Sequence, residues 1–119
     1  LNNLAIDFDG VVHTFDKGWH DGTCYGEPLP GALEAVARLA KNYNIIIFTA
    51  KAKPSRPLVD GKTGTELVSE WLEKHNVLQF VDEITAEKPR SQVYIDDKGY
   101  HFQNWEDTLK YLEEKDGKI

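Results

Sequence analysis

The residues nearest the start of the chain that could carry chemistry are two aspartates, Asp7 and Asp9, followed at once by Gly10. A short apolar run precedes them. Because alternate side chains of a strand share a face, both carboxylates would project together where such a strand ends. Two neighbouring carboxylates repel each other unless a cation or a reaction uses them. The pattern therefore fits either a strand that runs into an Asp-Gly turn or a pair that works chemically.

Polar side chains also follow later apolar runs of the chain. Thr49 comes directly after one run, Asp96 and Asp97 come directly after another, and Lys88 lies shortly before that second run. In a parallel sheet the carboxyl ends of the strands meet at one edge, where ligands bind. We therefore expect these side chains to lie close to the first carboxylate pair. Asp96-Asp97 followed by Lys-Gly also fits a simple turn.

Four carboxylates gathered at one edge require a hard cation. Oxygen ligands in an incomplete set suit Mg²⁺, which keeps several waters and binds through a few carboxylates and a phosphate. Thr49 adds a hydroxyl and Lys88 a positive charge. A cation, donors and an oxygen nucleophile are what phosphoryl transfer needs. One aspartate could attack phosphorus, and the second could act as general acid and base.

Strands that alternate with helices must position these groups. We expect a first strand from Leu4 to the aspartate pair, further strands and helices along the chain, and one domain over residues 1–119. The later elements are strands at 45–48, 80–84, 92–95 and 100–102, and helices from 30–31 to about 42, over 65–75 and from about 105 to 114. This order predicts an α/β fold with a three-layer, Rossmann-like parallel sheet and helices on both faces.

The segment after the first strand is rich in glycine and aromatic residues. Residues 11–15 and the region around Tyr25 could pair, with turns at 16–18 and 21–22. We predict a β-hairpin flap that hangs over the carboxylates.

Composition excludes several classes of protein. The formal net charge is −6, which disfavours tight non-specific binding to nucleic acid through a broad basic surface. The single cysteine, Cys24, rules out an internal disulfide and fits a reducing compartment. No apolar run approaches membrane-spanning length and no signal peptide precedes the first strand, so we expect a cytoplasmic protein with no membrane association. The oligomeric state stays open.

The chemistry-bearing residues together resemble a known family. The set consists of Asp7-x-Asp9-x-Val11, Thr49 after an apolar strand, Lys88, and Asp96-Asp97 after another strand. In order and spacing it resembles the four motifs of the haloacid dehalogenase (HAD) superfamily, over nearly the whole chain. Each motif alone is common, whereas all of them in order form a specific signal. The resemblance implies a HAD-type sheet and a magnesium-dependent phosphomonoester hydrolase.

The resemblance also implies roles for these residues. Asp7 would be the nucleophile that forms a phospho-aspartate, and Asp9 the general acid and base. Thr49 and Lys88 would hold the phosphoryl oxygens. The metal set would be Asp7, Asp9 (through its backbone carbonyl), Asp96 and Asp97. Which of the last two touches Mg²⁺ directly is left open.

The chain departs from most such phosphatases in having no room for a cap domain between the motifs. The resemblance then points to small capless phosphatases, including the phosphatase half of polynucleotide kinase-phosphatases, although the chain has no P-loop motif. An open site suits bulky substrates such as nucleic acid ends, nucleotides or phosphoproteins, or it requires a partner chain as a lid. A sugar phosphate is also possible.

Two other classes of protein compete with this interpretation. A receiver-type signalling module also uses an acidic cluster, Thr, Lys and an accepting Asp around Mg²⁺. Its acceptor would lie on the middle strand, where this chain offers only Asp82 and Glu83. A non-catalytic HAD-like binding domain is the other alternative.

Several conspicuous residues have simple structural interpretations. Lys51, Lys53 and Arg56 could steer an anionic substrate, but we expect a solvated loop. Trp19 and Tyr25 could stack on a base or pack on their own loop.

The remaining aromatic, histidine and cysteine residues also have structural interpretations. Trp71 and Trp105 fit the apolar stripes of helices, so we expect them in the core. His13, His20 and Cys24 match no zinc pattern. His75 and His101 are expected to be structural or surface residues.

Overall fold

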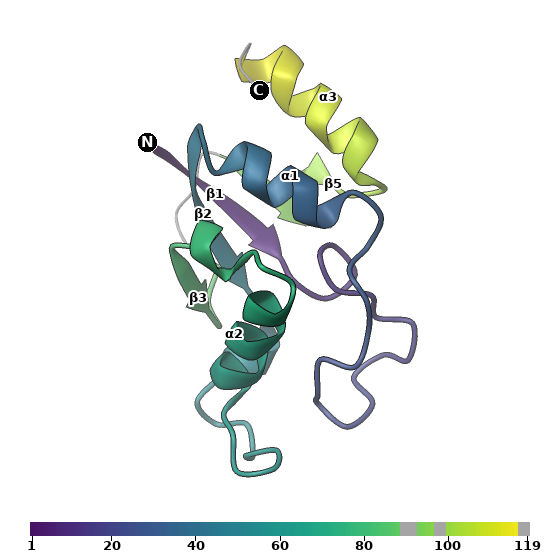
Figure 1. Ribbon diagram of the computed structural model, residues 1–119, viewed down its shortest axis with the longest axis vertical. Helices are drawn as coiled ribbons and strands as arrows, with labels where there is room; N and C mark the ends of the chain where they lie inside the picture. The colour runs from purple at the N-terminus through teal and green to yellow at the C-terminus, as the bar shows by residue number, and fades with distance from the viewer. Residues whose placement is uncertain (89–92, 97–99, 117–119) are drawn as a thin grey trace.

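The structure, a computed structural model, describes residues 1–88, 93–96 and 100–116, without the side chains of Asp96 and Asp116. It is an α/β fold with one five-stranded sheet in the order β3-β2-β1-β4-β5, and every neighbouring pair is parallel (Figure 1). The elements are β1 (Asn2–Asp7), α1 (Ala32–Leu39), β2 (Tyr43–Phe48), the 3-10 turn η1 (Ala50–Ala52), α2 (Gly64–Lys74), the 3-10 turn η2 (Leu78–Phe80), β3 (Glu83–Thr85), β4 (Val93–Asp96), β5 (Tyr100–His101) and α3 (Trp105–Asp116). The parallel α/β architecture is therefore confirmed.

The central strand of the sheet is β1, with β2 on one side and β4 on the other. Leu4 lies opposite Ile45 of β2 and Val93 of β4, and all three are buried. Strands that are buried inside a parallel sheet have continuously apolar sequences rather than alternating ones. This is why the apolar runs in the sequence predicted these strands. The register brings the carboxyl ends of β1, β2 and β4 to one edge of the sheet.

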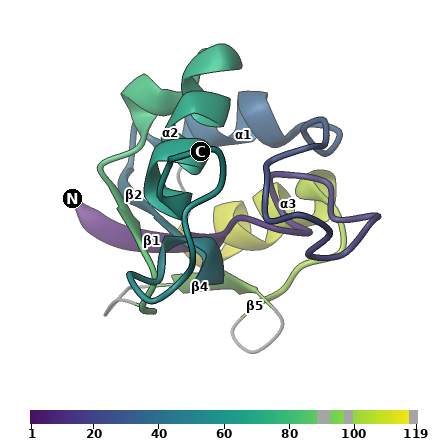
Figure 2. The same cartoon turned by 90° about the horizontal axis from the view of Figure 1, so that it is seen from below.

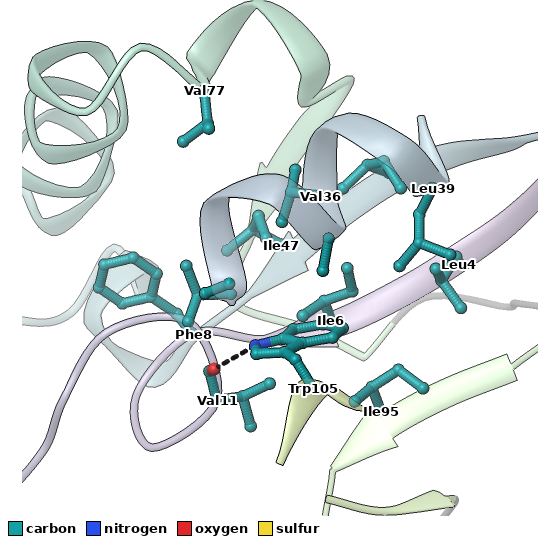
Figure 3. Packing of buried hydrophobic residues seen from close by; sticks show 14 of the residues in the cluster. Leu4, Ile6, Phe8, Val11, Val36, Leu39, Ile47, Val77, Ile95 and Trp105 are labelled. Carbon is teal, nitrogen blue, oxygen red and sulfur yellow. Dashed lines mark hydrogen bonds between the residues drawn. The ribbon is translucent and has the colours of Figure 1, made fainter. Parts of the chain in front are cut away.

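The three helices lie over one face of the sheet (Figure 2). Their buried side chains, including Val36, Leu72 and Leu112, join one cluster with Ile6 and Ile47 of the sheet. Figure 3 shows part of this core. The right-handed connections β1-α1-β2 and β2-α2-β3 advance in the same direction and so place both helices on the same side, and α3 contacts α1.

The expected three-layer arrangement is therefore wrong for the part of the chain that the structure describes. There the connection that returns from β3 to β4 contains no helix, so no helix covers the opposite face. None of the described helices has the length and apolar character needed to cross a membrane.

Most predicted elements are present, with shifted bounds. The strand expected at 80–84 is divided into η2 and the shorter β3. The helix α2 begins with a capping box, in which Thr63 Oγ1 accepts from the Glu66 N–H and the Glu66 carboxylate accepts from the Thr63 N–H. These reciprocal bonds satisfy two N–H groups that a helix start leaves without partners.

The segment between β1 and α1, residues 8–31, is described throughout and contains no regular strand. In place of the predicted hairpin with Tyr25, a short antiparallel contact joins His13 to Pro28. It is closed by hydrogen bonds from Thr14 N to the Glu27 carbonyl and from Leu29 N to the Val12 carbonyl, at 3.0 and 2.9 Å. We call this segment the long loop.

Two buried tryptophans fix the long loop to the helices. The indole N–H of Trp105 in α3 donates to the Val11 carbonyl at 3.0 Å (Figure 3). The indole N–H of Trp71 in α2 donates to the Gly26 carbonyl at 2.9 Å. Both tryptophans belong to the core, as their spacing predicted. The long loop is therefore held at both of its ends rather than hanging free.

Candidate active site at the carboxyl edge of the sheet

The predicted site residues begin at the carboxyl ends of neighbouring strands. Asp7 is the last residue of β1 and is paired in register with Phe48, the last residue of β2. Thr49 follows directly and continues the sheet, since its N–H donates to the Thr85 carbonyl at 2.9 Å. Asp96 is the last residue of β4, on the other side of β1. The backbone thus places these three positions at one edge.

A tight turn after β1 determines where Asp9 lies. The Phe8 carbonyl accepts hydrogen bonds from the N–H groups of Val11, Val12 and His13, at 3.3, 2.9 and 2.9 Å. Gly10, with a φ of +81°, supplies the left-handed conformation that the turn requires. The turn brings His13 back against Asp9.

The Asp9 carboxylate accepts a hydrogen bond at each of its oxygens. His13 Nδ1 lies 2.9 Å from Oδ1, and Lys51 Nζ lies 2.8 Å from Oδ2. Both partners are almost fully buried, with side-chain exposures of 0% for His13 and 1% for Lys51, and the Asp9 side chain is 14% exposed. The carboxylate is thus fixed in orientation and keeps a small exposed surface.

His13 is also held from its other side. The Gly26 N–H donates to His13 Nε2 at 2.9 Å, so the ring proton lies on Nδ1 and is donated to Asp9. The ring stacks on Phe8 with an interplanar angle of 3° and meets Trp71 edge-on. A Cβ on residue 26 would overlap the Thr14 hydroxyl and lie close to the His13 ring, so glycine favours this approach of the loop.

Lys51 is the clearest disagreement with the sequence interpretation, which expected a solvated loop. Its side chain is buried and its ammonium lies 5.1 Å from the Phe15 ring centroid and 4.7 Å from that of Trp19. The long loop therefore supplies an aromatic wall for a lysine of a distant segment. The carboxylate of Asp9 compensates the charge, which a buried ammonium requires.

The 3-10 turn η1 positions Lys51 through its backbone. Thr49 Oγ1 accepts a hydrogen bond from the Lys51 N–H at 3.2 Å. The Lys51 carbonyl packs against the first residue of α2, where a Cβ added to Gly64 would lie only 1.6 Å from it. Thr49 is itself buried, with 3% exposure, so its hydroxyl serves this turn in the arrangement seen.

Lys88 is exposed and lies near two aromatic rings of the sheet. Its ammonium is 5.8 Å from the Phe48 ring centroid and 4.6 Å from that of Tyr94. Phe48 is the residue paired with Asp7, and Tyr94 belongs to β4. Lys88 therefore lies near β2 and β4, the two strands on either side of β1.

The donor set for a metal can be judged in part. Asp97 and the Asp96 side chain lie outside the described residues. Within the described part, no group of three or more His, Cys, Asp or Glu side chains could hold a metal. The predicted donors are oxygens only, the Asp7 carboxylate and the Asp9 carbonyl among them, and this chemistry fits Mg²⁺ rather than a soft metal.

Cys24 and the other histidines occupy structural or surface positions. Burial raises the pKa of the Cys24 thiol to about 12, with Lys51 lowering it and Asp9 raising it, so the thiol stays protonated at neutral pH. The His75 ring packs at a tilt against Trp71, with the ring centroids 4.4 Å apart, and His20 and His101 are exposed.

Tyr25 and Lys53 have the structural or solvated positions considered for them in the sequence, whereas Trp19 contacts a neighbouring segment. The Tyr25 hydroxyl donates to the Gly18 carbonyl at 2.8 Å and accepts from the Lys17 N–H, so it packs on its own loop. Lys53 is exposed, as expected for a solvated loop. Trp19 instead reaches across to Lys51 and Arg56.

The sequence did not predict that His13 and Lys51 bind the Asp9 carboxylate, and for Lys51 it suggested only the steering of an anionic substrate. The signals were present but weak, because His13 lies four residues after Asp9 and Lys51 two residues after Thr49. Their relevance depends on how the long loop folds back, which spacing alone does not determine. Comparisons with models of protein families, with curated proteins and with solved structures found no match to this chain.

Proposed function

We propose that this chain is a magnesium-dependent phosphomonoesterase of the HAD type that acts through a phospho-aspartate on Asp7. The observation that carries the proposal is the Asp9 carboxylate, which is held by Lys51 and His13 at the strand edge where Asp7 ends β1. A structural Asp-Gly turn requires no buried lysine. A group that passes protons does require a fixed carboxylate with some access to a substrate.

In the first step, a carboxylate oxygen of Asp7 attacks phosphorus while the bond from phosphorus to the leaving oxygen breaks. Asp9 gives a proton to that oxygen. In the second step Asp9 takes a proton from water, whose oxygen attacks the acyl phosphate, so that phosphate leaves and Asp7 is restored. When bound, Mg²⁺ would neutralise the charge of the phosphoryl oxygens, and Asp7, the Asp9 carbonyl, Asp96 and Asp97 would hold it.

The hydrogen bonds of Asp9 correspond to the second of these steps. In that step Asp9 starts as a carboxylate, and both of its oxygens accept hydrogen bonds in the structure. For the first step one oxygen has to carry the proton, so the donor facing that oxygen has to turn away. Lys51 and His13 are positioning residues in this mechanism, because they act through Asp9.

Asp82, the phosphate acceptor that a receiver module would use, binds the backbone of β2 instead. Its carboxylate accepts from the Ile45 N–H at 2.8 Å, and its own N–H donates to the Ile45 carbonyl. It precedes β3, away from the edge where Asp7 lies. This arrangement favours the phosphatase over the receiver.

The test is phosphate release with Mg²⁺ across sugar phosphates, nucleotides, phosphopeptides and 3′-phosphorylated oligonucleotides. We expect turnover of at least one class, its loss on chelation, and its loss in Asp7→Asn with the circular dichroism spectrum unchanged. Turnover that persists in Asp7→Asn would exclude Asp7 as the nucleophile. Asp82→Asn serves as the matched control and should retain turnover.

A further inference from the structure

A cavity of about 190 Å³ lies between the long loop and the segment after β2. Trp19, Lys51, Arg56, Val59 and Leu67 are among the residues that line it. Lys51 belongs both to this wall and to the ion pair with Asp9, whose Oδ2 it meets at 2.8 Å. Lys51 therefore links the wall of the cavity to Asp9, the group that would protonate the leaving oxygen.

The wall carries one cation whose guanidinium has no carboxylate partner among the described residues, Arg56. This guanidinium is stacked 4.3 Å from the Trp19 ring centroid. The charge of Lys51 is already compensated by Asp9. Asp21 also lines the cavity, but its carboxylate is exposed and is held by two hydrogen bonds from Thr23. Arg56 is thus positioned to bind an anion through its free N–H groups.

The two loops around the cavity are joined to each other. Trp19 of the long loop contacts both Lys51 and Arg56 of the segment after β2. Gly22 of the long loop also lies close to the segment after β2, because a Cβ added to Gly22 would be 3.5 Å from the Val59 side chain. Both loops leave the carboxyl end of the sheet, at the bottom of Figure 1. The two loops therefore restrict the space around the cavity. The net charge of −6 also disfavours a polynucleotide as the ligand of the cavity.

We infer that this cavity is the leaving-group subsite, and that it takes a small alcohol carrying an anionic group that Arg56 binds. The inference rests on the proposed phosphatase function and narrows its substrate class. It replaces the bulky substrates expected of an open site with small phosphate esters that carry a second negative charge.

The test compares matched esters on one enzyme. Propyl phosphate has a neutral leaving group, while the phosphate esters of 3-hydroxypropionate and of 3-phosphooxypropanol add a carboxylate or a second phosphate. We expect kcat/KM for at least one anionic ester to exceed that for propyl phosphate by about tenfold. The ester with the higher kcat/KM shows whether Arg56 binds a carboxylate or a phosphate. In Arg56→Gln the ratio should fall to near one, whereas Lys53→Gln, which removes an exposed lysine of the same segment, should leave the ratio intact.

Size is tested separately with a 3′-phosphorylated trinucleotide. We expect the wild type to use it at least tenfold less well than the preferred anionic ester, and Trp19→Ala to narrow this gap more than Trp19→Phe does. Equal use of neutral and anionic esters, a ratio insensitive to Arg56→Gln, or preference for the trinucleotide would each overturn the inference.

Binding without turnover separates this inference from the proposed function. Calorimetry with Asp7→Asn and each of the two anionic esters should show, for at least one of them, an affinity that Arg56→Gln lowers about tenfold and Lys53→Gln does not. If no ester is hydrolysed but this Arg56-dependent binding is present, the phosphatase function fails and the anion subsite stands. If esters are hydrolysed without Arg56-dependent binding or selectivity, the subsite fails alone.

Discussion

At the residue scale, the Asp9 carboxylate is the centre of the hydrogen bonding at this edge of the sheet. Lys51 reaches it from the segment after β2, and His13 reaches it from the turn after β1. Gly26 and Phe8 in turn hold the His13 ring. An aspartate held by two donors in this way keeps a defined direction, which is what a general acid and base needs.

The first prediction concerns the buried lysine. Lys51→Met keeps an unbranched apolar stem but leaves the Asp9 carboxylate without its cation. Removal of one partner of a buried pair is strongly unfavourable, so we expect the free energy of unfolding to fall by about 3 kcal/mol. Urea unfolding measures it.

The matched control is Lys53→Met, because Lys53 is exposed on the same segment. It should change stability by less than about 0.5 kcal/mol. An equal effect of both substitutions would show that the ion pair with Asp9 contributes nothing specific. In phosphate release, Lys51→Met should lower kcat more than it changes KM, because Lys51 acts through Asp9.

At the element scale, the 3-10 turn η1 and the helix α2 form one unit around the Lys51 backbone. The capping box of Thr63 and Glu66 begins α2, and Gly64 then allows the helix to pack against the Lys51 carbonyl. The helix α2 and the turn η1 together fix the position of the Lys51 backbone, from which its side chain reaches Asp9.

A substitution at Gly64 separates local helix propensity from this packing. Alanine is favoured over glycine within a helix by about 1 kcal/mol. At Gly64, however, its Cβ would overlap the Lys51 carbonyl, so we expect Gly64→Ala to destabilise the protein and to lower phosphate release. Thermal unfolding and the phosphate assay measure the two effects. Ser69→Ala, on the same helix, is the control, and a Gly64→Ala protein more stable than wild type would refute this packing.

The sequence could predict the elements more readily than their tertiary contacts. The runs Leu4–Ile6 and Ile45–Phe48 are recognisable because strands buried in a parallel sheet are continuously apolar. The burial of Lys51 was not predictable, since it depends on Phe15 and Trp19 of a segment distant in the sequence. Local polarity around Lys51 indicates only a loop.

The dependence on tertiary contacts also explains why the predicted hairpin and the predicted three-layer arrangement are wrong. Turn residues in the segment 11–30 favoured a hairpin, but its path is determined by Trp71 and Trp105, which bind its carbonyls from two helices. Alternating strands and helices favoured three layers, but sequence pattern does not state which face each helix covers. Asp7, Asp9 and Thr49 lie at or just after strand ends, where the apolar runs predicted strands to end.

At the scale of the whole molecule, the long loop, the sheet and the helices form one core. Val11 and Val12 of the loop are buried in the same cluster as Ile6 and Leu112. The loop that carries His13 should therefore unfold together with the helices rather than open separately.

Substitution of Trp105 tests this coupling. Trp105→Phe removes the N–H that binds the Val11 carbonyl and leaves a space in the core. We expect a loss of about 2 kcal/mol in unfolding free energy and faster proteolysis within the long loop. Trp19→Phe, at a ring that is 37% exposed, should have a smaller effect on stability. Unchanged proteolysis in Trp105→Phe would show that the loop is independent of α3.

The central claim is that Asp7 is the residue that takes the phosphoryl group. Incubation with acetyl phosphate and Mg²⁺, followed by borohydride reduction and mass spectrometry, identifies the carboxylate that was phosphorylated. Phosphorylation at Asp7, absent in Asp7→Asn and present in Asp82→Asn, is the predicted result. Phosphorylation at Asp82, or phosphate release with no phosphorylated Asp7, would contradict it.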